Sequence, residues 1–304
     1  MAAPWPPLPF ETWQPTCDTL HAHAQVLGKI AAALAPPEPE FQHLPLRVTA
    51  RGLETPQLPA PDGSGSFGVA LDLHAHEAVV ENVDGRLRRV PLTPNRAVAD
   101  VTHDVLDAVS AVAGRVEITF KPQETAWSTP LDEDREHATY DEAQVADYFA
   151  AVSRAASVLA AFRAPYRGRS TQVNAWWGSF DVAVSLFSGR GADPPSQDFI
   201  MRNAMDAQEI AVGWWPGDAR YPKPAFYAYA YPAVDDLRSG SLSPSYWNDE
   251  LGEYVLDWEV VCATDDPFAT AIAFARGFAD HACTVCSWDP VLAKTIAGEP
   301  PPVA

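Results

Sequence analysis

Three segments in the second half of the chain combine aromatic side chains with carboxylates. They are WWGSFDVAVSLF at 176–187, EIAVGWW at 209–215 and AFYAYAY at 225–231. Their apolar and polar residues alternate with a period of two, which predicts strands with two distinct faces. The face opposite the apolar one holds Trp177, Ser179, Asp181, Glu209, Trp215, Tyr227 and Tyr229. Aromatic rings with polar tips beside a few carboxylates suit a site for a small polar or cationic molecule.

Asp181 and Glu209 are also the candidates for acid–base chemistry. Two carboxylates about 5–10 Å apart, one with a pKa raised by burial, can hydrolyse a bond held between them. The sequence does not fix that distance, so whether the protein is an enzyme stays open. Ser179 is not a nucleophile of the common kind, because the chain has no GxSxG sequence.

A second interpretation of the aromatic face is structural. Tyr and Trp also suit half-hydrated boundaries between domains, where the ring is buried and the polar tip finds a partner. The face is then a seam against the first half of the chain, or the interface of a non-catalytic interaction or scaffold protein. A pocket located at the seam would satisfy both interpretations, and a deep pocket with convergent carboxylates distinguishes ligand binding from a flat protein interface.

A row of polar residues near the N-terminus is a further candidate. His21, Gln25 and Lys29 are spaced by four residues and share one side of a predicted helix over 16–33. Lys29 could bind an anionic or carbonyl group, and His21 could act as acid or base near neutral pH. The alternative is a solvated helix face, which is common on amphipathic helices.

The sequence holds no signature of a metal or cofactor site. Gly-rich phosphate loops and HExxH are absent, and Asp72 and His76 do not make a full ligand set. Cys283 and Cys286 lie late in an Ala-rich helical pattern, without the second cysteine pair that structural zinc requires, so we predict buried and unreactive cysteines. We predict neither a metal nor a cofactor.

The charge of the chain disfavours several classes of partner. Its 21 Lys and Arg stand against 40 Asp and Glu, a net charge of −19 that repels nucleic acids and anionic lipid surfaces. The N-terminus lacks a basic, apolar leader, and no run of about 18 apolar residues occurs. We expect a cytoplasmic protein without nucleic-acid or membrane partners, and its oligomeric state is open.

The period of the hydrophobic residues predicts an α+β protein with two similar helix–sheet–helix halves that share a seam, the arrangement expected of a tandem pseudo-repeat. In the first half we predict the helix over 16–33, strands in LRVTARG and FGVALDLH, a hairpin at Asp84-Gly85, a helix over 96–112 and a strand in RVEITF at 115–120. In the second half we predict a helix capped by Asp141, the three aromatic strands and a helix over 268–287.

These elements divide the chain into four parts. Residues 1–121 form the N-terminal half, 122–139 a solvated acidic connection, 140–291 the C-terminal half, and 292–304 a disordered tail. At 304 residues, the chain exceeds the size at which one core usually stops growing.

The chain resembles an uncharacterised bacterial family, a domain of unknown function, over nearly its whole length. The resemblance is carried by TLHAHAQVLGKI, TARGLETP, HATYD, WGSFDVAVSLFSGR, WWPG and PAFYAYAYP. It implies a full-length member of one family and brings no activity with it. It also implies that the family pattern includes His21, Gln25, Lys29, Arg51, His137, Asp181, Arg190 and Glu209. Arg51 and Arg190 therefore join the candidate ligand-binding residues.

One departure from the family pattern lies beside Glu209. The pattern resembles Tyr-Ser-His-Glu there, whereas this chain has Asp206, Ala207, Gln208 and Glu209. If that histidine is a ligand or catalyst in relatives, this chain lacks the activity. The cysteine pair at 283 and 286 is likewise outside the pattern.

Overall fold

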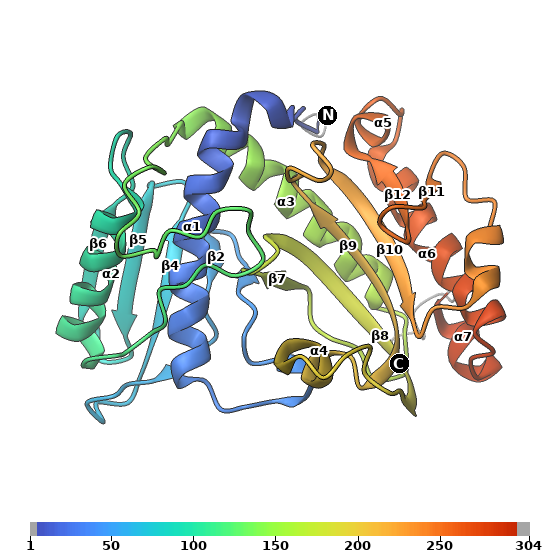
Figure 1. Cartoon of the computed structure of the whole chain (residues 1–304), viewed down its shortest axis with the longest axis horizontal. Helices are drawn as coiled ribbons and strands as arrows, with labels where there is room; N and C mark the ends of the chain where they lie inside the picture. Colours follow the sequence, from blue (N-terminus) through green and yellow to red (C-terminus); the bar gives the residue numbers. More distant parts are fainter. Residues whose placement is uncertain (1–4, 297–304) are drawn as a thin grey trace, which may run out of the picture.

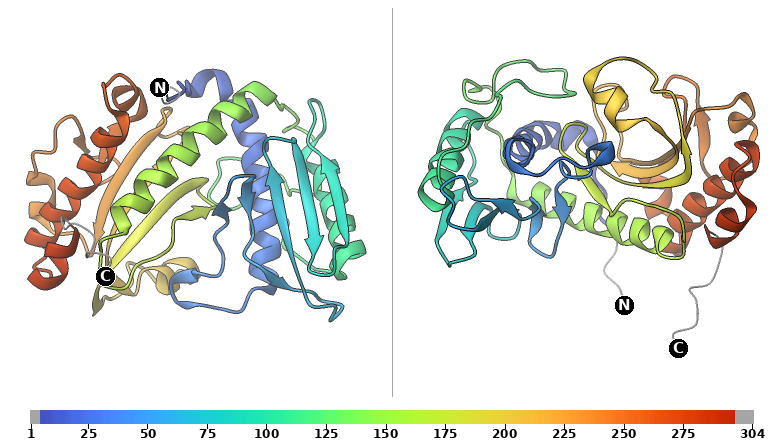
Figure 2. Two further views of the ribbon diagram at one scale, coloured as in Figure 1. Left: turned by 180° about the vertical axis from the view of Figure 1, so that it is seen from behind. Right: turned by 90° about the horizontal axis from the view of Figure 1, so that it is seen from below.

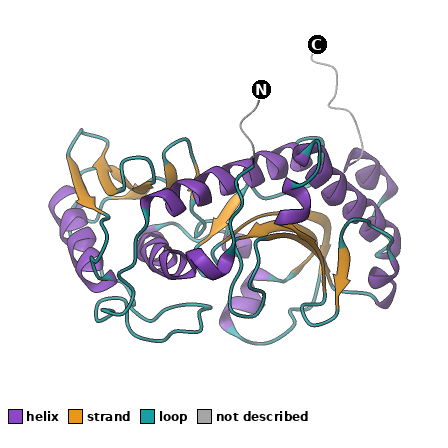
Figure 3. Ribbon diagram, turned by 90° about the horizontal axis from the view of Figure 1, so that it is seen from above, coloured by secondary structure: helices purple, strands orange, loops and turns teal. Residues whose placement is uncertain are grey.

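A computed structural model describes residues 5–296 of the chain. The fold is α+β, as predicted, with two antiparallel sheets and helices packed against them. Figure 1 shows the N-terminal sheet on the left, the C-terminal sheet on the right and the long helix α1 in front, between them. In the view from above the C-terminal strands are strongly curved (Figure 3).

The N-terminal half contains α1, a six-stranded sheet and α2. Its elements are α1 (Phe10–Leu34), η1 (Pro39–Phe41), β1 (Arg47–Val48), β2 (Gly52–Glu54), β3 (Leu58–Pro59), β4 (Ser66–Asp72), β5 (Glu77–Asn82), β6 (Leu87–Pro91) and α2 (Val98–Ala113). The strands follow the order β1-β2-β4-β5-β6, and β3 pairs with β4. The predicted Asp84-Gly85 hairpin is confirmed: Gly85 has φ 88° in the turn that joins β5 to β6.

The C-terminal half contains α3, a second six-stranded sheet and three further helices after it. Its elements are α3 (Glu142–Arg163), β7 (Asn174–Trp176), β8 (Asp181–Gly191), α4 (Phe199–Ala204), β9 (Ala207–Trp215), β10 (Ala225–Tyr231), η2 (Asp235–Ser239), β11 (Tyr246–Asn248), β12 (Glu253–Asp257), α5 (Trp258–Cys262), α6 (Pro267–Val285) and α7 (Pro290–Ile296). The strand order is β11-β12-β10-β9-β8-β7. The Asp141 cap is confirmed, since its carboxylate accepts from the Gln144 N–H.

The two faces of the C-terminal sheet differ as the alternation predicts. Val184, Val212 and Phe226 are fully buried on the face that packs against α3 and α6. The view from behind in Figure 2 shows α3 lying across this face. Helix α3 is long and apolar enough to cross a membrane by length and composition, but a core helix of this kind passes the same test. The opposite face turns toward α1.

The two halves share one hydrophobic core. Buried apolar residues form a single cluster that includes Leu27 of α1, Val80 of β5, Val184 of β8 and Phe278 of α6. The two sheets also touch directly, because Leu46 and Ala175 exchange two backbone hydrogen bonds of 2.9 Å across the boundary. The halves are therefore joined by both packing and backbone pairing.

Three local predictions differ from the structure, one entirely and two in part. Residues 115–120 belong to no strand of the structure, although Val116 and Ile118 pack against the core. The connection 122–139 is only partly solvated, because Asp134 is buried and its carboxylate lies 2.7 Å from His137 Nδ1. The start of the predicted disordered tail is helical in α7, while residues 297–304 lie outside the described part.

Candidate functional site

A cavity of about 1470 Å³ lies where the C-terminal sheet faces the N-terminal half. We call it the seam cavity. Its walls come from α1, the segment 117–127, η1, β7 to β10, α4 and the loop at 217–220. The volume exceeds the range of about 300–1,000 Å³ that is common for small-molecule sites. The aromatic face of the sheet and the helical row of α1 thus border the same space.

Asp181 lies at the start of β8 and is 6% exposed. Its carboxylate accepts hydrogen bonds from Ser179 Oγ at 2.5 Å and from the Tyr227 hydroxyl. Burial raises its pKa, and the two hydrogen bonds oppose that rise because they favour the charged form. No lysine or arginine forms an ion pair with Asp181 among the described residues.

A glycine allows Tyr227 to reach that carboxylate. Tyr227 on β10 and Asp181 on β8 are separated by β9, where Gly213 is the residue paired with Tyr227. A Cβ atom at Gly213 would lie 2.3 Å from Tyr227 Cζ and 2.4 Å from its hydroxyl oxygen. The phenol therefore lies flat over β9 only because residue 213 has no side chain.

Glu209 lies on β9 and is 5% exposed. Burial raises the pKa of its carboxyl to about 7, hydrogen bonds from Ser185 and Tyr229 oppose the rise, and the nearby charge of Glu40 adds to it. The Tyr229 hydroxyl lies 3.4 Å from Glu209 Oε1. The Glu40 carboxylate is itself held by the Arg169 guanidinium at 2.5 and 2.8 Å.

The hypothesis that Asp181 and Glu209 act as one catalytic pair is wrong on geometric grounds. Glu209 pairs with Phe187, which is six residues beyond Asp181 on β8. At about 3.3 Å per residue, the two positions are about 20 Å apart along the strand. This is far beyond the separation of about 5–10 Å that hydrolysis between two carboxylates requires.

The raised pKa of Glu209 predicts an effect on stability. Its carboxyl titrates near pH 7 in the folded protein and near 4.5 when free, so the folded protein loses stability as pH rises between these values. We expect Glu209→Gln to match wild type near pH 4.5 and to be more stable by about 3 kcal/mol above pH 8. Urea unfolding at both pH values measures this difference. The exposed Glu81→Gln is the control, and a gain for Glu209→Gln that is equal at both pH values would contradict the prediction.

His21 connects α1 to the turn between β7 and β8. Its Nε2 lies 3.0 Å from the carbonyl oxygens of both Trp177 and Gly178. Carbonyls only accept, so these two contacts place the proton on Nε2, and the Gln25 amide nitrogen, 3.1 Å from the same atom, then cannot donate to it. Burial lowers the pKa of the ring to about 4, which leaves His21 neutral at pH 7. The ring stacks on Phe180, whose centroid lies 4.8 Å away.

The conformation of that turn is unusual. Phe180 has φ 60°, a left-handed value that is disfavoured for a bulky side chain. Its ring lies between His21 and Tyr148, with centroids 5.2 Å apart in the second pair. Strained backbone of this kind persists only where the surroundings hold it in place, and it occurs often at functional sites.

The other members of the helical row have different roles. Lys29 borders the seam cavity with 4% exposure. Gln25 is fully buried behind the wall: its amide donates to the Gln123 carbonyl at 2.8 Å and accepts from the Gln123 N–H at 2.9 Å. The row is therefore a buried wall, and the alternative of a solvated helix face is wrong.

Trp177 packs against α1 where Gly28 leaves space for its ring, since a Cβ there would lie 2.0 Å from Trp177 Cγ.

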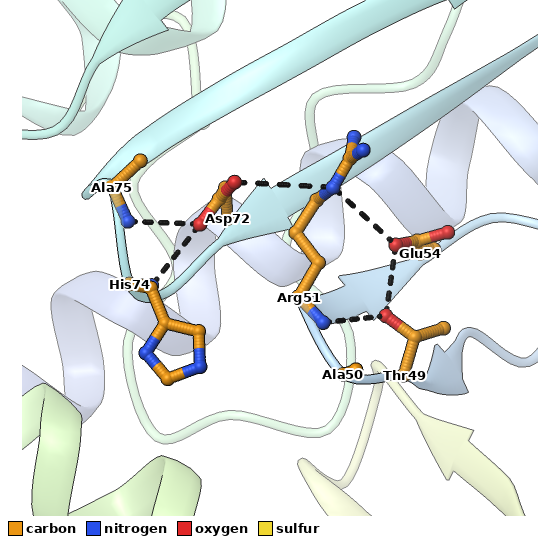
Figure 4. Close-up of a pocket in the computed structure, with 7 residues that line it drawn as sticks. All are labelled: Thr49, Ala50, Arg51, Glu54, Asp72, His74 and Ala75. Atoms are coloured by element: carbon orange, nitrogen blue, oxygen red, sulfur yellow. Dashed lines mark hydrogen bonds and ion pairs between the residues drawn. The ribbon is translucent and has the colours of Figure 1, made fainter.

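Three predicted ligand-binding residues lie away from the seam cavity. Arg51 borders a separate shallow pocket of about 660 Å³, where its Nε lies 3.8 Å from Glu54 and from Asp72 (Figure 4). Arg190 is exposed near the end of β8, with Nη1 3.4 Å from the Ser287 carbonyl. Trp215 packs beside Tyr227 with centroids 5.2 Å apart and does not border the cavity. Apart from Gln25, which lies behind the wall, the remaining candidates all border it: His21, Lys29, Trp177, Ser179, Asp181, Glu209, Tyr227 and Tyr229.

The sequence did not single out two carboxyls near Asp181. Glu124 borders the cavity beside Gly178 and is exposed to solvent, but desolvation by the protein atoms around its carboxyl, followed by the charge of Asp181, raises its pKa. The same two causes raise the pKa of Glu253 on β12 to about 7. Glu124 lies in the stretch that the sequence predicts to be a solvated connection, and Glu253 lies in a stretch for which it predicts no strand. The pattern ELGEYVLD around Glu253 is the feature of the sequence that could have predicted the strand on which it lies.

No group of three or more His, Cys, Asp or Glu residues within 5–296 is arranged to hold a metal ion. The cysteines are free thiols. Cys283 is buried and Cys286 half-buried at the end of α6, and burial raises the pKa of both thiols, to about 12 for Cys283. High thiol pKa values disfavour nucleophilic or redox roles. The predicted burial is confirmed for Cys283 but not for Cys286, which is half-buried.

Comparison with known proteins gives one match. A profile described as a family of unknown function (DUF5996) matches residues 5–295, nearly the whole chain. Neither the curated proteins nor the solved structures include a match to this sequence.

Proposed function

We propose a function for this chain, which belongs to the family of unknown function DUF5996: it binds a small cationic molecule, such as an amine, in the seam cavity. The proposal rests on one observation. The lining of the cavity carries many more carboxyls than cations. The carboxyls are those of Asp18, Glu40, Glu117, Glu124, Asp181, Asp198, Glu209 and Asp218, whereas the cations are Lys29 and Arg220.

Within this excess of carboxyls over cations, the buried carboxylates that lack a basic partner are the groups that would favour a bound cation. Arg220 pairs with Asp218 at 2.8 Å, and Arg169 pairs with Glu40, so those acids already have partners. Asp181 and Glu209 are nearly fully buried, and within the described residues they accept hydrogen bonds from hydroxyl groups but form no ion pair with a lysine or arginine. Buried carboxylates without a basic partner carry a desolvation cost that a bound cation would offset.

Aromatic rings around these carboxylates support the same class of ligand. Tyr227 and Tyr229 are stacked with centroids 6.3 Å apart and border the cavity between the two acids. Aromatic faces attract cations within about 6 Å, most strongly when water is excluded. We place the amine at one of the two carboxylates and an apolar part of the ligand along the rings. A cytoplasmic location fits an acidic protein of this kind and is part of the proposal.

The test is a binding screen with simple amines near pH 8, where Glu209 is ionised. We expect hexylamine, tyramine or choline to raise the thermal midpoint of wild type, and hexanol to leave it unchanged. A ligand at 100 times its Kd adds about 2.7 kcal/mol to stability. One of the two variants Asp181→Asn and Glu209→Gln should weaken amine binding about tenfold or more. The variant that does so removes the carboxylate that forms a charge-assisted hydrogen bond with the amine.

The control for that screen is Glu81→Gln, which removes the same charge from an exposed position outside the cavity. It should bind the amines like wild type. If both cavity variants unfold without ligand, the carboxylates are structural and the binding proposal fails. If no amine stabilises wild type, the alternative of an interaction protein gains support, and the exposed Phe199, Ile200 and Met201 of α4 beside the cavity are then the surface to test.

A further inference from the structure

Lys29 is a buried cation without a counter-ion. The residue is 4% exposed and borders the seam cavity. Its Nζ lies 3.4 Å from Thr119 Oγ1, a long contact, and 5.4 Å from the centre of the Trp177 ring. None of the ion pairs within residues 5–296 includes Lys29.

Such an arrangement is costly unless something else supplies the negative charge. Lysine is almost never fully buried without a partner, because removal of an ammonium from water costs several kcal/mol in a folded protein. A neutral amine is not the explanation at neutral pH. Burial lowers the pKa of Lys29 to about 8, so most molecules still carry the charge at pH 7.

The cavity therefore leaves charges of both signs unpaired. The sheet presents Asp181 and Glu209 without a basic partner, and α1 presents Lys29 without an acidic one. These groups come from opposite walls and are not close enough to form an ion pair with each other. A molecule that spans the cavity can complete both sets of pairs at once.

We propose that the ligand of the seam cavity is zwitterionic, with a carboxylate that pairs with Lys29 and an amine that pairs with Asp181 or Glu209. This inference rests on the proposed function and specifies its ligand as an amino acid or a similar molecule with separated charges. The acidic lining limits the anionic part to a single charge, since phosphate-rich molecules would be repelled by the eight cavity carboxyls.

The experiment compares matched probes by calorimetry near pH 7. The probes are a series of linear ω-amino acids of increasing length, the alkylamine that matches each one, and its fatty acid without the amine. We expect one length of amino acid to bind wild type at least about tenfold more tightly than its alkylamine, because a buried ion pair is gained. The fatty acid alone should bind weakly, since the carboxylates of the sheet repel it.

Variants of Lys29 test whether this residue supplies the gain. In Lys29→Met, which keeps the length of the apolar stem, the amino acid should lose its advantage, while the alkylamine binds as well as before or better. Lys29→Arg should keep part of the advantage. The control is Lys121→Met, which removes an exposed lysine from outside the cavity and should leave both affinities unchanged. Lys29→Met should also unfold at a higher temperature than wild type without ligand, because it removes an unpaired buried charge.

The outcomes separate this inference from the proposed function. If alkylamines bind wild type as tightly as every amino acid of the series, the cavity binds cations without regard to a carboxylate. The inference then fails, while the proposed function stands. An amino-acid advantage that survives in Lys29→Met would also overturn it, because another group then holds the carboxylate. If none of the amines or amino acids binds, the proposed function and the inference fail together.

Discussion

Gly213→Ala is expected to destabilise the protein by about 4 kcal/mol and to weaken amine binding. The new methyl group would lie 2.3 Å from Tyr227 Cζ, within the ring that crosses β9. Overpacking costs about 1–3 kcal/mol, and displacement of the phenol adds about 1–3 kcal/mol because the buried Asp181 loses a hydrogen-bond donor. Urea unfolding gives the stability, and the amine screen gives the binding.

A second strand glycine provides the control for that substitution. Gly68 on β4 has Thr55 Oγ1 as its nearest neighbour, 3.9 Å from a Cβ, so an alanine fits there. Gly68→Ala should be neutral or slightly stabilising, since alanine loses less backbone entropy on folding. Equal effects of the two substitutions would show that Gly213 is not required for the position of Tyr227.

Acidification from about pH 7 to about pH 3 is expected to remove about 8 kcal/mol of stability through two buried histidines. Burial lowers the pKa of His21 to about 4 and that of His23 to about 3, against 6.5 for a free ring. The unfolded chain takes up these protons first, so stability present above pH 6.5 is lost as pH falls through the folded pKa values. The shifts correspond to about 3 and about 5 kcal/mol.

The measurement is urea unfolding as a function of pH for wild type and His23→Gln. Because Glu209 and Glu253 act in the opposite direction between about pH 4.5 and 7, the useful quantity is the difference between the two proteins. The variant should lose stability less steeply in acid than wild type. His103→Gln, on the exposed side of α2, should follow the wild-type curve. If the stability of His23→Gln fell with pH in parallel with that of wild type, the lowered pKa of His23 would be contradicted.

Much of the fold follows from local patterns in the sequence. The period of two in 225–231 correctly separated Phe226, on the helix-covered face, from Tyr227 and Tyr229 on the cavity face. Asp141 and Asp84-Gly85 predicted a helix start and a hairpin because each acts through its immediate neighbours. Such signals depend on a few adjacent residues, so they predict local structure without knowledge of the tertiary structure.

Properties that depend on pairing between distant segments could not be predicted in this way. The segment 115–120 has a strand-like alternation but pairs with no strand of the structure, because alternation does not specify a hydrogen-bonded partner. The separation of Asp181 from Glu209 is set by the register of β8 against β9, which alternation leaves undetermined. Glu124 joins the site only because residues 122–127 return across the cavity.

The continuous core restricts how a chain of this architecture can change during evolution. Leu46 and Ala175 join the two sheets, and one apolar cluster extends through both halves. Neither half is thus a portable module that could be recombined with an unrelated domain, since a severed half would expose apolar surface and lose one wall of the cavity. Exchange of one half would therefore require a partner half with a matching surface.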